Sequence, residues 1–241
     1  MKYFYLIISF VFICSFNVFA AENNNESIKR AIRANDLASV ENFINQSQNI
    51  NERDDEGYTP LHYALLKNRL EIAKKLIDAG ADINAPSSED GMTPLLIATS
   101  RANKLQEKAQ KIMERSEGDV ENRVIVIKLK KYIAKQMNLA RKMLEILIEA
   151  GADLNQETPF GTPLMNASTN SWNADIIDIL IKSGANVNAR DRNGRTALFY
   201  GEIFGGDSIS TKLISYGADV SVKDNNDKTY MEITADDFND N

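Results

Sequence analysis

One motif recurs along this chain and constrains its fold more than any other feature. Residues 59–84 begin with Thr-Pro-Leu-His-Tyr-Ala and end with Gly-Ala-Asp-Ile-Asn. We number this unit copy two. Similar units follow as copies three, four and five at residues 91–155, 161–188 and 193–220, and weaker ones flank them at residues 27–51 and 227–233. A short unit of this kind cannot bury its own apolar face, so neighbouring copies are expected to stack around a shared core.

The residue types within copy two predict a pair of antiparallel helices. Thr59 is a suitable N-cap, and Pro60 fits the first helical turn, where its missing N–H would have no partner anyway. Apolar side chains follow at helical spacing, at Leu61, Ala64, Ile72, Leu76 and Ile77. Gly80 ends the second helix, because glycine adopts a left-handed backbone without steric cost.

The opening and closing motifs of copy two, at residues 59–64 and 80–84, together resemble the ankyrin repeat. The resemblance implies an all-α fold, an ankyrin-repeat solenoid of helix–turn–helix units with short β-turn tips. It covers residues 26–236, as about five repeats and a partial C-terminal cap, and leaves residues 237–241 as a tail. We expect an elongated, curved array with atypical ends.

Copy three carries a long insertion. Thr59 and Gly80 are 21 residues apart, whereas the equivalent Thr93 and Gly151 are 58 apart, so copy three has 37 extra residues. On the returning arm, seam residues alternate three and four apart, at Val126, Leu129, Ile133, Gln136, Ala140, Met143 and Leu147. This spacing is typical of a two-helix coiled coil. Residues 101–140 are therefore predicted to form an antiparallel helical hairpin within the third repeat.

The insertion differs in charge from the rest of the chain. Residues 101–140 contain ten basic and five acidic residues, a net charge of +5, although the whole chain carries −6. A basic arm on an acidic body would steer an acidic protein partner toward one place. The alternative is that these Lys and Arg residues only keep an exposed helix soluble. An acidic chain is a poor candidate for general nucleic-acid binding, which depends on basic side chains.

The first twenty residues have the pattern of a secretory signal peptide. Lys2 precedes an apolar run over residues 3–19 without an acid, and Val18 and Ala20 are the small residues of a cleavage site. We expect cleavage after Ala20, a periplasmic or secreted chain, and no stable membrane insertion afterwards. An uncleaved anchor is the alternative. Cys14, the only cysteine, follows Ile13, where a lipoprotein signal would have a small residue, so lipidation is not expected.

The residue types do not indicate an enzyme. His62 is the only histidine and lies within the repeat motif, where its ring is expected to bond neighbouring turn groups. Most acid–base, triad and zinc sites need several His or Cys residues. Acidic pairs such as Asp54-Asp55 and Asp236-Asp237 lack calcium-loop spacing. We therefore expect no catalytic, cofactor-binding or metal-binding residues.

The ankyrin resemblance implies that a protein partner docks on the inner helices and the turn tips. The matching or neighbouring positions chosen here are Tyr58, Leu66, Lys67, Met92, Arg101, Phe160, Trp172, Arg195, Ile203 and Phe204, and the insertion adds Lys128, Lys130 and Lys131. Exposed aromatic residues often carry binding energy. The alternative for the aromatic positions is that each fills space between neighbouring copies.

These features predict a non-catalytic protein-binding scaffold in the periplasm or secreted, monomeric when free, that sequesters or inhibits a protein partner. A more specific hypothesis makes it an immunity protein against an exported toxin. Two alternatives stay open: a secreted effector that binds host proteins, and an enzyme with an unfamiliar site. Cell fractionation would separate the effector from a periplasmic scaffold, and turnover that survives purification would indicate an enzyme.

Overall fold

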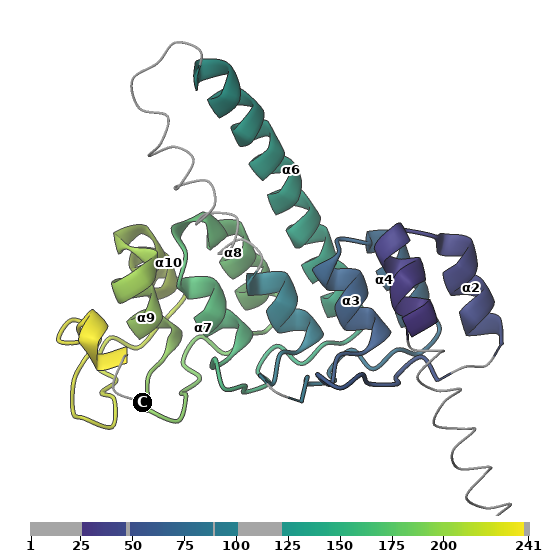
Figure 1. The fold of residues 1–241 in the computed structure, drawn as a ribbon. Coiled ribbons are helices and arrows are strands. Elements are labelled where there is room, and N and C mark those ends of the chain that lie inside the picture. The colour runs from purple at the N-terminus through teal and green to yellow at the C-terminus, as the bar shows by residue number, and fades with distance from the viewer. Residues whose placement is uncertain (1–25, 47–48, 89, 101–121, 239–241) are drawn as a thin grey trace, which may run out of the picture. The chain divides into compact units, whose positions relative to one another are not determined.

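The structure, a computed structural model, describes residues 26–46, 49–88, 90–100 and 122–238 (Figure 1). The expected signal peptide and the first arm of the insertion lie outside these residues. The chain divides into two compact units. Unit 1 contains the residues up to Asp82 together with Ser87–Glu89, and unit 2 contains Ile83–Pro86 and the residues from Asp90 onward.

Unit 1 consists of two helical hairpins. The first pairs the helix at residues 26–34 with α2 (Leu37–Asn45), and the second pairs α3 (Pro60–Leu66) with α4 (Leu70–Asp78). The apolar positions predicted for copy two are fully buried at Leu61, Ala64, Ile72 and Leu76 and partly buried at Ile77. The weak motif at residues 27–51 thus forms a helical hairpin, as expected for a divergent first copy.

The motif residues of copy two have the local roles that their chemistry predicts. The Thr59 N–H donates to Nδ1 of His62 over 3.1 Å, and the Thr59 hydroxyl lies 2.8 Å from the same nitrogen. His62 is completely buried, so its structural role is confirmed. Gly80 has a φ of +89°, and an added Cβ there would meet nothing within 4 Å, so only the backbone conformation requires glycine.

Unit 2 contains the three remaining full copies and the partial sixth. Its helices, in chain order, are residues 94–100, α6 (Asn122–Glu149), α7 (Pro163–Ser168), the 3-10 helix η1 (Ser171–Asn173), α8 (Ala174–Lys182), α9 (Ala197–Tyr200), the π-helix η2 (Gly201–Gly205), α10 (Asp207–Ser215) and the 3-10 helix η3 (Ala235–Phe238). Across the described ranges, extended pairing is limited to isolated bridges, Thr158 with Gly161 and Lys223 with Thr229. The predicted all-α class is confirmed.

Asparagine side chains connect the ends of successive copies. Within unit 2, the side-chain oxygens of Asn84, Asn155 and Asn188 accept backbone N–H groups from Asp153 (2.9 Å), Asn186 (2.8 Å) and Asp219 (2.8 Å). The last two pairs are 31 residues apart in sequence, but Asn84 and Asp153 are 69 apart. The same bond therefore forms despite the insertion, which indicates that the extra residues lie inside copy three without disturbing its end.

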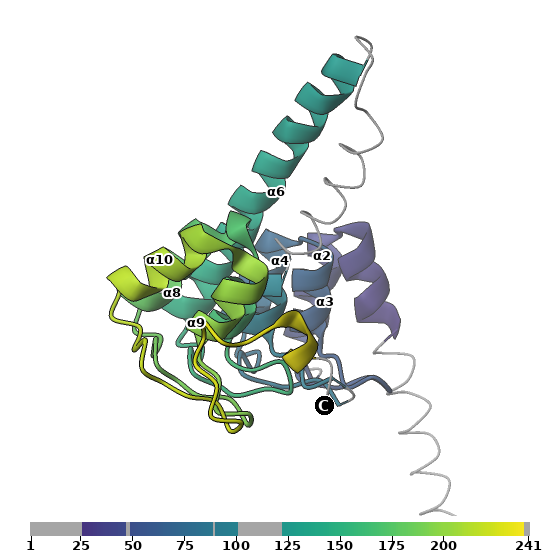
Figure 2. The same ribbon diagram turned by 90° about the vertical axis from the view of Figure 1, so that its left-hand side faces the viewer.

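Helix α6 is the described arm of the insertion. Four of the predicted seam residues are buried, at Ile133, Ala140, Met143 and Leu147, whereas Leu129 and Gln136 are partly buried. At 28 residues α6 is about 42 Å long, and it extends past the other helices of unit 2 in both views (Figures 1 and 2). Its predicted partner arm lies outside the described residues, so the coiled coil stays a prediction.

Copy five is packed closely against copy four. A Cβ added at Gly205, the last residue of η2, would lie 2.3 Å from the backbone oxygen of Ser168 at the end of α7. Real side chains do not approach backbone so closely, and only glycine allows this contact between η2 and α7. Gly206, with a φ of +77°, is then the N-cap of α10.

Candidate functional site

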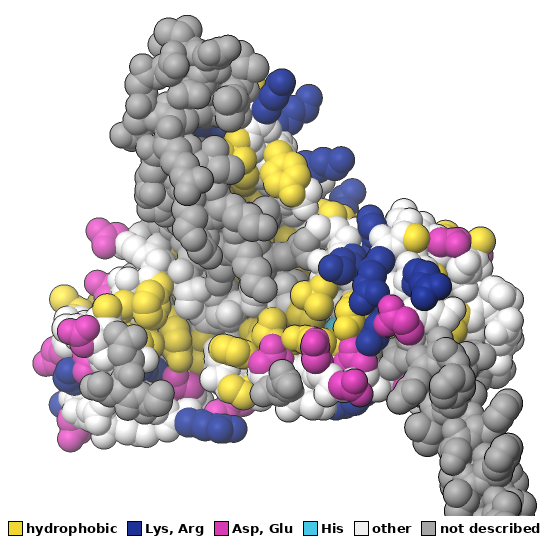
Figure 3. All heavy atoms as spheres, in the orientation of Figure 1, with side chains coloured by type: hydrophobic (Ala, Val, Ile, Leu, Met, Phe, Trp, Pro, Cys, Tyr) yellow, Lys and Arg dark blue, Asp and Glu magenta, His cyan; other side chains and the backbone are white. Residues whose placement is uncertain are grey.

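The outer face of α6 is basic and partly apolar. Lys128, Lys130 and Lys131 are exposed there, and Ile127 and Tyr132, which precede and follow them in the chain, are 65% and 55% exposed. Figure 3 shows Lys and Arg side chains along this helix. The sequence of α6 contains no acidic residue before Glu145, so the positive charge is not neutralised within its own helix. We call these five residues the α6 surface.

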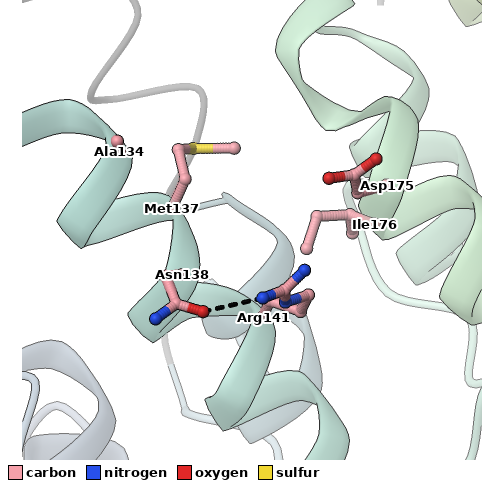
Figure 4. Close-up of a pocket in the computed structure, with 6 residues that line it drawn as sticks. All are labelled: Ala134, Met137, Asn138, Arg141, Asp175 and Ile176. Carbon is pink, nitrogen blue, oxygen red and sulfur yellow. Dashed lines mark hydrogen bonds between the residues drawn. The ribbon is translucent and has the colours of Figure 1, made fainter. Parts of the chain in front are cut away.

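A small pocket lies between α6 and α8. Its lining is drawn in Figure 4 and consists of Ala134, Met137, Asn138, Arg141, Asp175 and Ile176. Arg141 donates a 2.8 Å hydrogen bond to Oδ1 of Asn138, while Met137 and Ile176 point toward one another from the two helices. The pocket volume of about 210 Å³ is below the range of roughly 300–1,000 Å³ that is usual for ligand sites. It therefore does not indicate a small-molecule substrate.

Arg195 is placed differently from what the sequence predicted. Only 2% of it is exposed, and its Nε lies 3.5 Å from a carboxylate oxygen of Asp224, which is also buried. Nη2 of Arg195 donates a hydrogen bond to the backbone carbonyl of Asp237. The guanidinium carbon lies 4.3 Å from the ring centroid of Phe238. The expectation that Arg195 is an exposed position is wrong while η3 is in place, because residues from later in the chain enclose its side chain.

Phe204 lies at the surface as predicted but has an intramolecular partner. It is 46% exposed, and its ring meets Phe238 edge to face with centroids 4.9 Å apart. Phe238 also meets Tyr200 edge to face at 5.1 Å. Residues 237 and 238 are thus packed against copy five, and the expectation that residues 237–241 form a tail is corrected at its first two positions.

Asp237 ties the same segment to the turn before it. One carboxylate oxygen pairs with Nζ of Lys228, and the other accepts the Thr234 N–H (2.8 Å) and hydroxyl (2.9 Å). The Lys228 contact and then the two Thr234 hydrogen bonds lower the pKa of Asp237 from 3.8 to about 2. Asp237 is therefore ionised at neutral pH and holds η3 by charge.

The predicted positions of unit 1 lie at the two ends of α3, Tyr58 just before the helix and Leu66 and Lys67 at its C-terminal end. Tyr58 is partly buried and makes edge-to-face contacts with His62 (5.5 Å) and Tyr63 (6.0 Å). Leu66 is partly buried and Lys67, at the end of α3, is exposed. Tyr58 thus supports the packing of its own copy and keeps part of its surface accessible, as both readings of the sequence allowed.

The other predicted docking residues of unit 2 are distant from one another in the sequence. Phe160 is exposed at the tip of the turn closed by Thr158 and Gly161, and its N–H donates to the Thr158 hydroxyl over 3.1 Å. Met92, Ile203 and Trp172, the last of these in η1, are partly buried. Arg101 lies outside the described residues. Phe160 is thus the most accessible aromatic of this group.

Three residues of these surfaces were not predicted from the sequence: Ile127, Tyr132 and Phe238. Ile127 and Tyr132 lie next to seam positions of α6, and an apolar residue just off a seam is a signal that could have been used. Phe238 follows two aspartates near the end of the printed sequence, and no local pattern indicates that it packs on Arg195, 43 positions earlier.

Metal-binding clusters and membrane-spanning helices are both absent from the described ranges. No cluster of three or more His, Cys, Asp or Glu side chains there could hold a metal ion. Among those same residues, no helix combines the length and the apolar character needed to cross a bilayer. The accessible side chains of both units lie on helix faces and turn tips.

The fold and these surfaces define a class of protein, a helical-hairpin repeat protein that offers side chains from successive copies. Comparison with known families agrees. The family described as ankyrin repeats (3 copies) matches residues 18–121 and 132–224. The chain belongs to the ankyrin-repeat family. Ankyrin repeats mediate protein–protein interaction and are typically non-catalytic, so a protein-binding scaffold is the class of function they indicate for this chain.

Individual relatives are similar only over the repeats. The chain is 34% identical over 65 residues to palmitoyltransferase akr1 of Aspergillus oryzae, covering 27% of this chain and 9% of that protein. It is 31% identical over 97 residues to ankyrin repeat, SAM and basic leucine zipper domain-containing protein 1 of Carollia perspicillata, covering 40% and 20%. A putative ankyrin repeat protein, FPV031 of fowlpox virus, is 34% identical over 83 residues, covering 33% and 24%. The chain thus spans a quarter or less of each of these relatives.

Proposed function

We propose that this chain is a non-catalytic scaffold, periplasmic or secreted, that sequesters or inhibits one acidic protein partner through the α6 surface. The observation that carries the proposal is the exposed basic and apolar face of a helix that extends past its neighbours in unit 2. A helix that served only to close copy three would not need about 42 Å. The nine residues of α8 and of α10 suffice for the equivalent position in copies four and five.

The composition of the α6 surface suits protein binding. Exposed Tyr132 and Ile127 offer apolar area on either side of the three lysines along the chain, and aromatic residues are enriched in protein interfaces. The lysines would speed association with an acidic partner and favour it over others, more than they would add to final affinity. The same charges argue that the partner is acidic.

The cellular part of the proposal rests on the first twenty residues of the sequence. A cleavable signal peptide would deliver the chain to the periplasm or beyond, where one dedicated partner, such as an exported toxin, would be held. N-terminal sequencing of the exported chain tests this directly. A first residue of Ala21 supports export and cleavage, whereas a chain that keeps Met1 in the cytoplasmic fraction would contradict it.

Reversing the charges of Lys128, Lys130 and Lys131 to Glu is expected to weaken capture of the partner. The partner is first identified by affinity capture from the exported fraction and mass spectrometry, and its association is then measured by surface plasmon resonance. We expect association at low salt to be slowed by about tenfold or more, with a smaller effect at high salt, where exposed charges are screened.

The matched control reverses the charge of three lysines outside α6. Lys74, Lys182 and Lys223 are exposed and belong to other elements than α6, and Glu at these three positions gives the same net charge. This control is expected to slow association much less than the α6 variant. Equal effects of the two variants would mean that overall charge, and not the α6 surface, governs capture. Circular dichroism checks that both remain folded.

A further inference from the structure

The segment at Ala235–Phe238 occupies a surface of copy five and shows what that surface can bind. Figure 1 shows η3, in yellow, next to α9. The receiving side chains are Arg195 and Tyr200 from the start and end of the α9 region, Phe204 from η2, and Lys228 from the turn before η3. We call these four residues the copy-five acceptor.

Each part of the bound segment meets a different kind of group. The ring of Phe238 lies against the rings of Tyr200 and Phe204 and against the guanidinium of Arg195. The carboxylate of Asp237 pairs with Lys228, and its backbone carbonyl accepts from Arg195. The acceptor thus recognises an aromatic ring, a negative charge and a main-chain carbonyl in a fixed order, which is the chemistry of an Asp-Phe dipeptide within a chain.

Two observations indicate that η3 is exchangeable. None of its four residues is buried, since Ala235 and Asp236 are exposed and Asp237 and Phe238 are only partly buried. Phe204 is still 46% exposed with Phe238 against it, so the aromatic part of the acceptor is wider than the segment that occupies it. A longer segment of the same chemistry would cover more of this area.

We propose that the copy-five acceptor binds a segment of the protein partner that carries an acidic residue followed by phenylalanine, and that Ala235–Phe238 is an intramolecular substitute that this segment displaces. The inference rests on the proposed protein-binding function and adds a second contact, distinct from the α6 surface. It agrees with an acidic partner, because both surfaces select negative charge. Arg195 changes from enclosed to accessible when η3 leaves.

A peptide-binding experiment tests the proposal. The probe is a fluorescein-labelled peptide with the sequence of residues 233–238, amidated so that no new carboxylate is added. Its fluorescence anisotropy is titrated with the parent chain and with a chain that ends at Thr234. A tethered segment competes at an effective concentration near the millimolar range. The shortened chain is therefore expected to bind the peptide at least about tenfold more tightly than the parent chain.

Control variants distinguish specific binding from non-specific hydrophobic binding. In the shortened chain, Phe204→Ala is expected to weaken peptide binding by about fivefold or more, whereas Phe160→Ala, which removes an equally exposed ring at another tip, leaves it unchanged. A peptide with Phe238→Ala is expected to lose at least about tenfold. If the shortened chain fails to fold, the full chain with Phe238→Ala replaces it, because this variant frees the acceptor and keeps the turn.

Two outcomes would overturn the proposal. A folded, freed chain that binds the peptide no better than the parent chain would show that η3 is only a structural cap or that the peptide binds elsewhere. A parent chain that dimerises with increasing concentration, and stops doing so after Phe238→Ala, would make a second copy the occupant.

The two proposals fail independently. Glu at positions 128, 130 and 131 is expected to leave peptide affinity of the shortened chain within about twofold, since short-range contacts dominate it. Undiminished partner capture by this Glu variant, with intact peptide binding, would therefore reject the α6 surface alone. Capture that the Glu variant weakens as expected, with no peptide binding by the shortened chain, would reject the copy-five acceptor alone.

Discussion

Replacing Asp224 with Ala is expected to lower the free energy of unfolding by about 3–5 kcal/mol, the usual cost of removing one partner of a buried ion pair. The side chains of Arg195 and Asp224 are 2% and 1% exposed. The carboxylate also accepts the N–H groups of Asn226 (2.9 Å) and Lys228 (3.0 Å). The Asp224→Ala variant would leave a guanidinium enclosed without its counter-charge and two turn N–H groups without their acceptor.

Urea unfolding followed by circular dichroism measures this loss. Asp219→Ala is the control, because Asp219 also accepts hydrogen bonds in a turn, from the Ser221 N–H and hydroxyl, but is exposed, and the unfolding midpoint of this variant should move much less. The double variant Arg195→Met with Asp224→Ala is expected to recover a large part of the loss, since no charge is then left buried. An Asp224→Ala variant as stable as the parent chain would mean that solvent reaches Arg195.

Truncation of Leu213 to Ala in α10 is expected to cost about 2–5 kcal/mol, whereas Ile214→Ala costs under about 1 kcal/mol. The two residues are neighbours on one helix of nine residues, but Leu213 is completely buried and Ile214 is 40% exposed. The same chemical change thus removes core packing at one position and surface packing at the other. The pair isolates burial from helix propensity, which Ala raises at both.

The same urea measurement checks this prediction. Unfolding midpoints and slopes of the two variants are compared with those of the parent chain, and far-UV spectra confirm that both fold. Similar losses for both variants would indicate that α10 is rotated about its axis relative to the structure. A larger loss at Ile214 would contradict the assignment of the repeat register in copy five.

Another contact on the same helix was not apparent from the sequence. Nζ of Lys212 lies 2.7 and 2.8 Å from the two carboxylate oxygens of Asp178 in α8, and the Tyr216 hydroxyl donates to the first of them over 2.9 Å. Partial burial opposes ionisation of Asp178, but these two hydrogen-bond donors outweigh it and lower the pKa of the carboxyl below 3.8. These hydrogen bonds join α8 of copy four to α10 of copy five, so they depend on how the two copies pack and not on a local sequence pattern.

Much of the fold could be predicted because its signals are local. A proline at a first turn, a glycine with a left-handed backbone and apolar residues at helical spacing act within one copy, and they placed the helices of copy two correctly. In each copy, the threonine before the first helix is expected to cap that helix. In copy four this N-cap hydrogen bond is present, because the Thr162 hydroxyl accepts the Met165 N–H over 3.3 Å. At Thr196 no side-chain cap is present, and its buried hydroxyl has no protein partner.

The candidate surfaces could be predicted only in part. The α6 lysines were singled out because the insertion is basic in an otherwise acidic chain, and they are exposed in the structure. Arg195 was misplaced because its tip position resembles exposed positions in other copies. Its burial depends on Asp224, 29 residues later, and on Phe238, beyond the last recognisable motif.

The sequence by itself determined the repeat unit, the ends of its helices, the place of the insertion and the net charge of each segment, since each follows from neighbouring residues. The tertiary structure alone decided which charged and aromatic side chains remain accessible. Exposure is set by whatever packs on a residue, and in this chain the packing groups come from other copies. For that reason the basic face of α6 was foreseeable, whereas the enclosure of Arg195 by η3 was not.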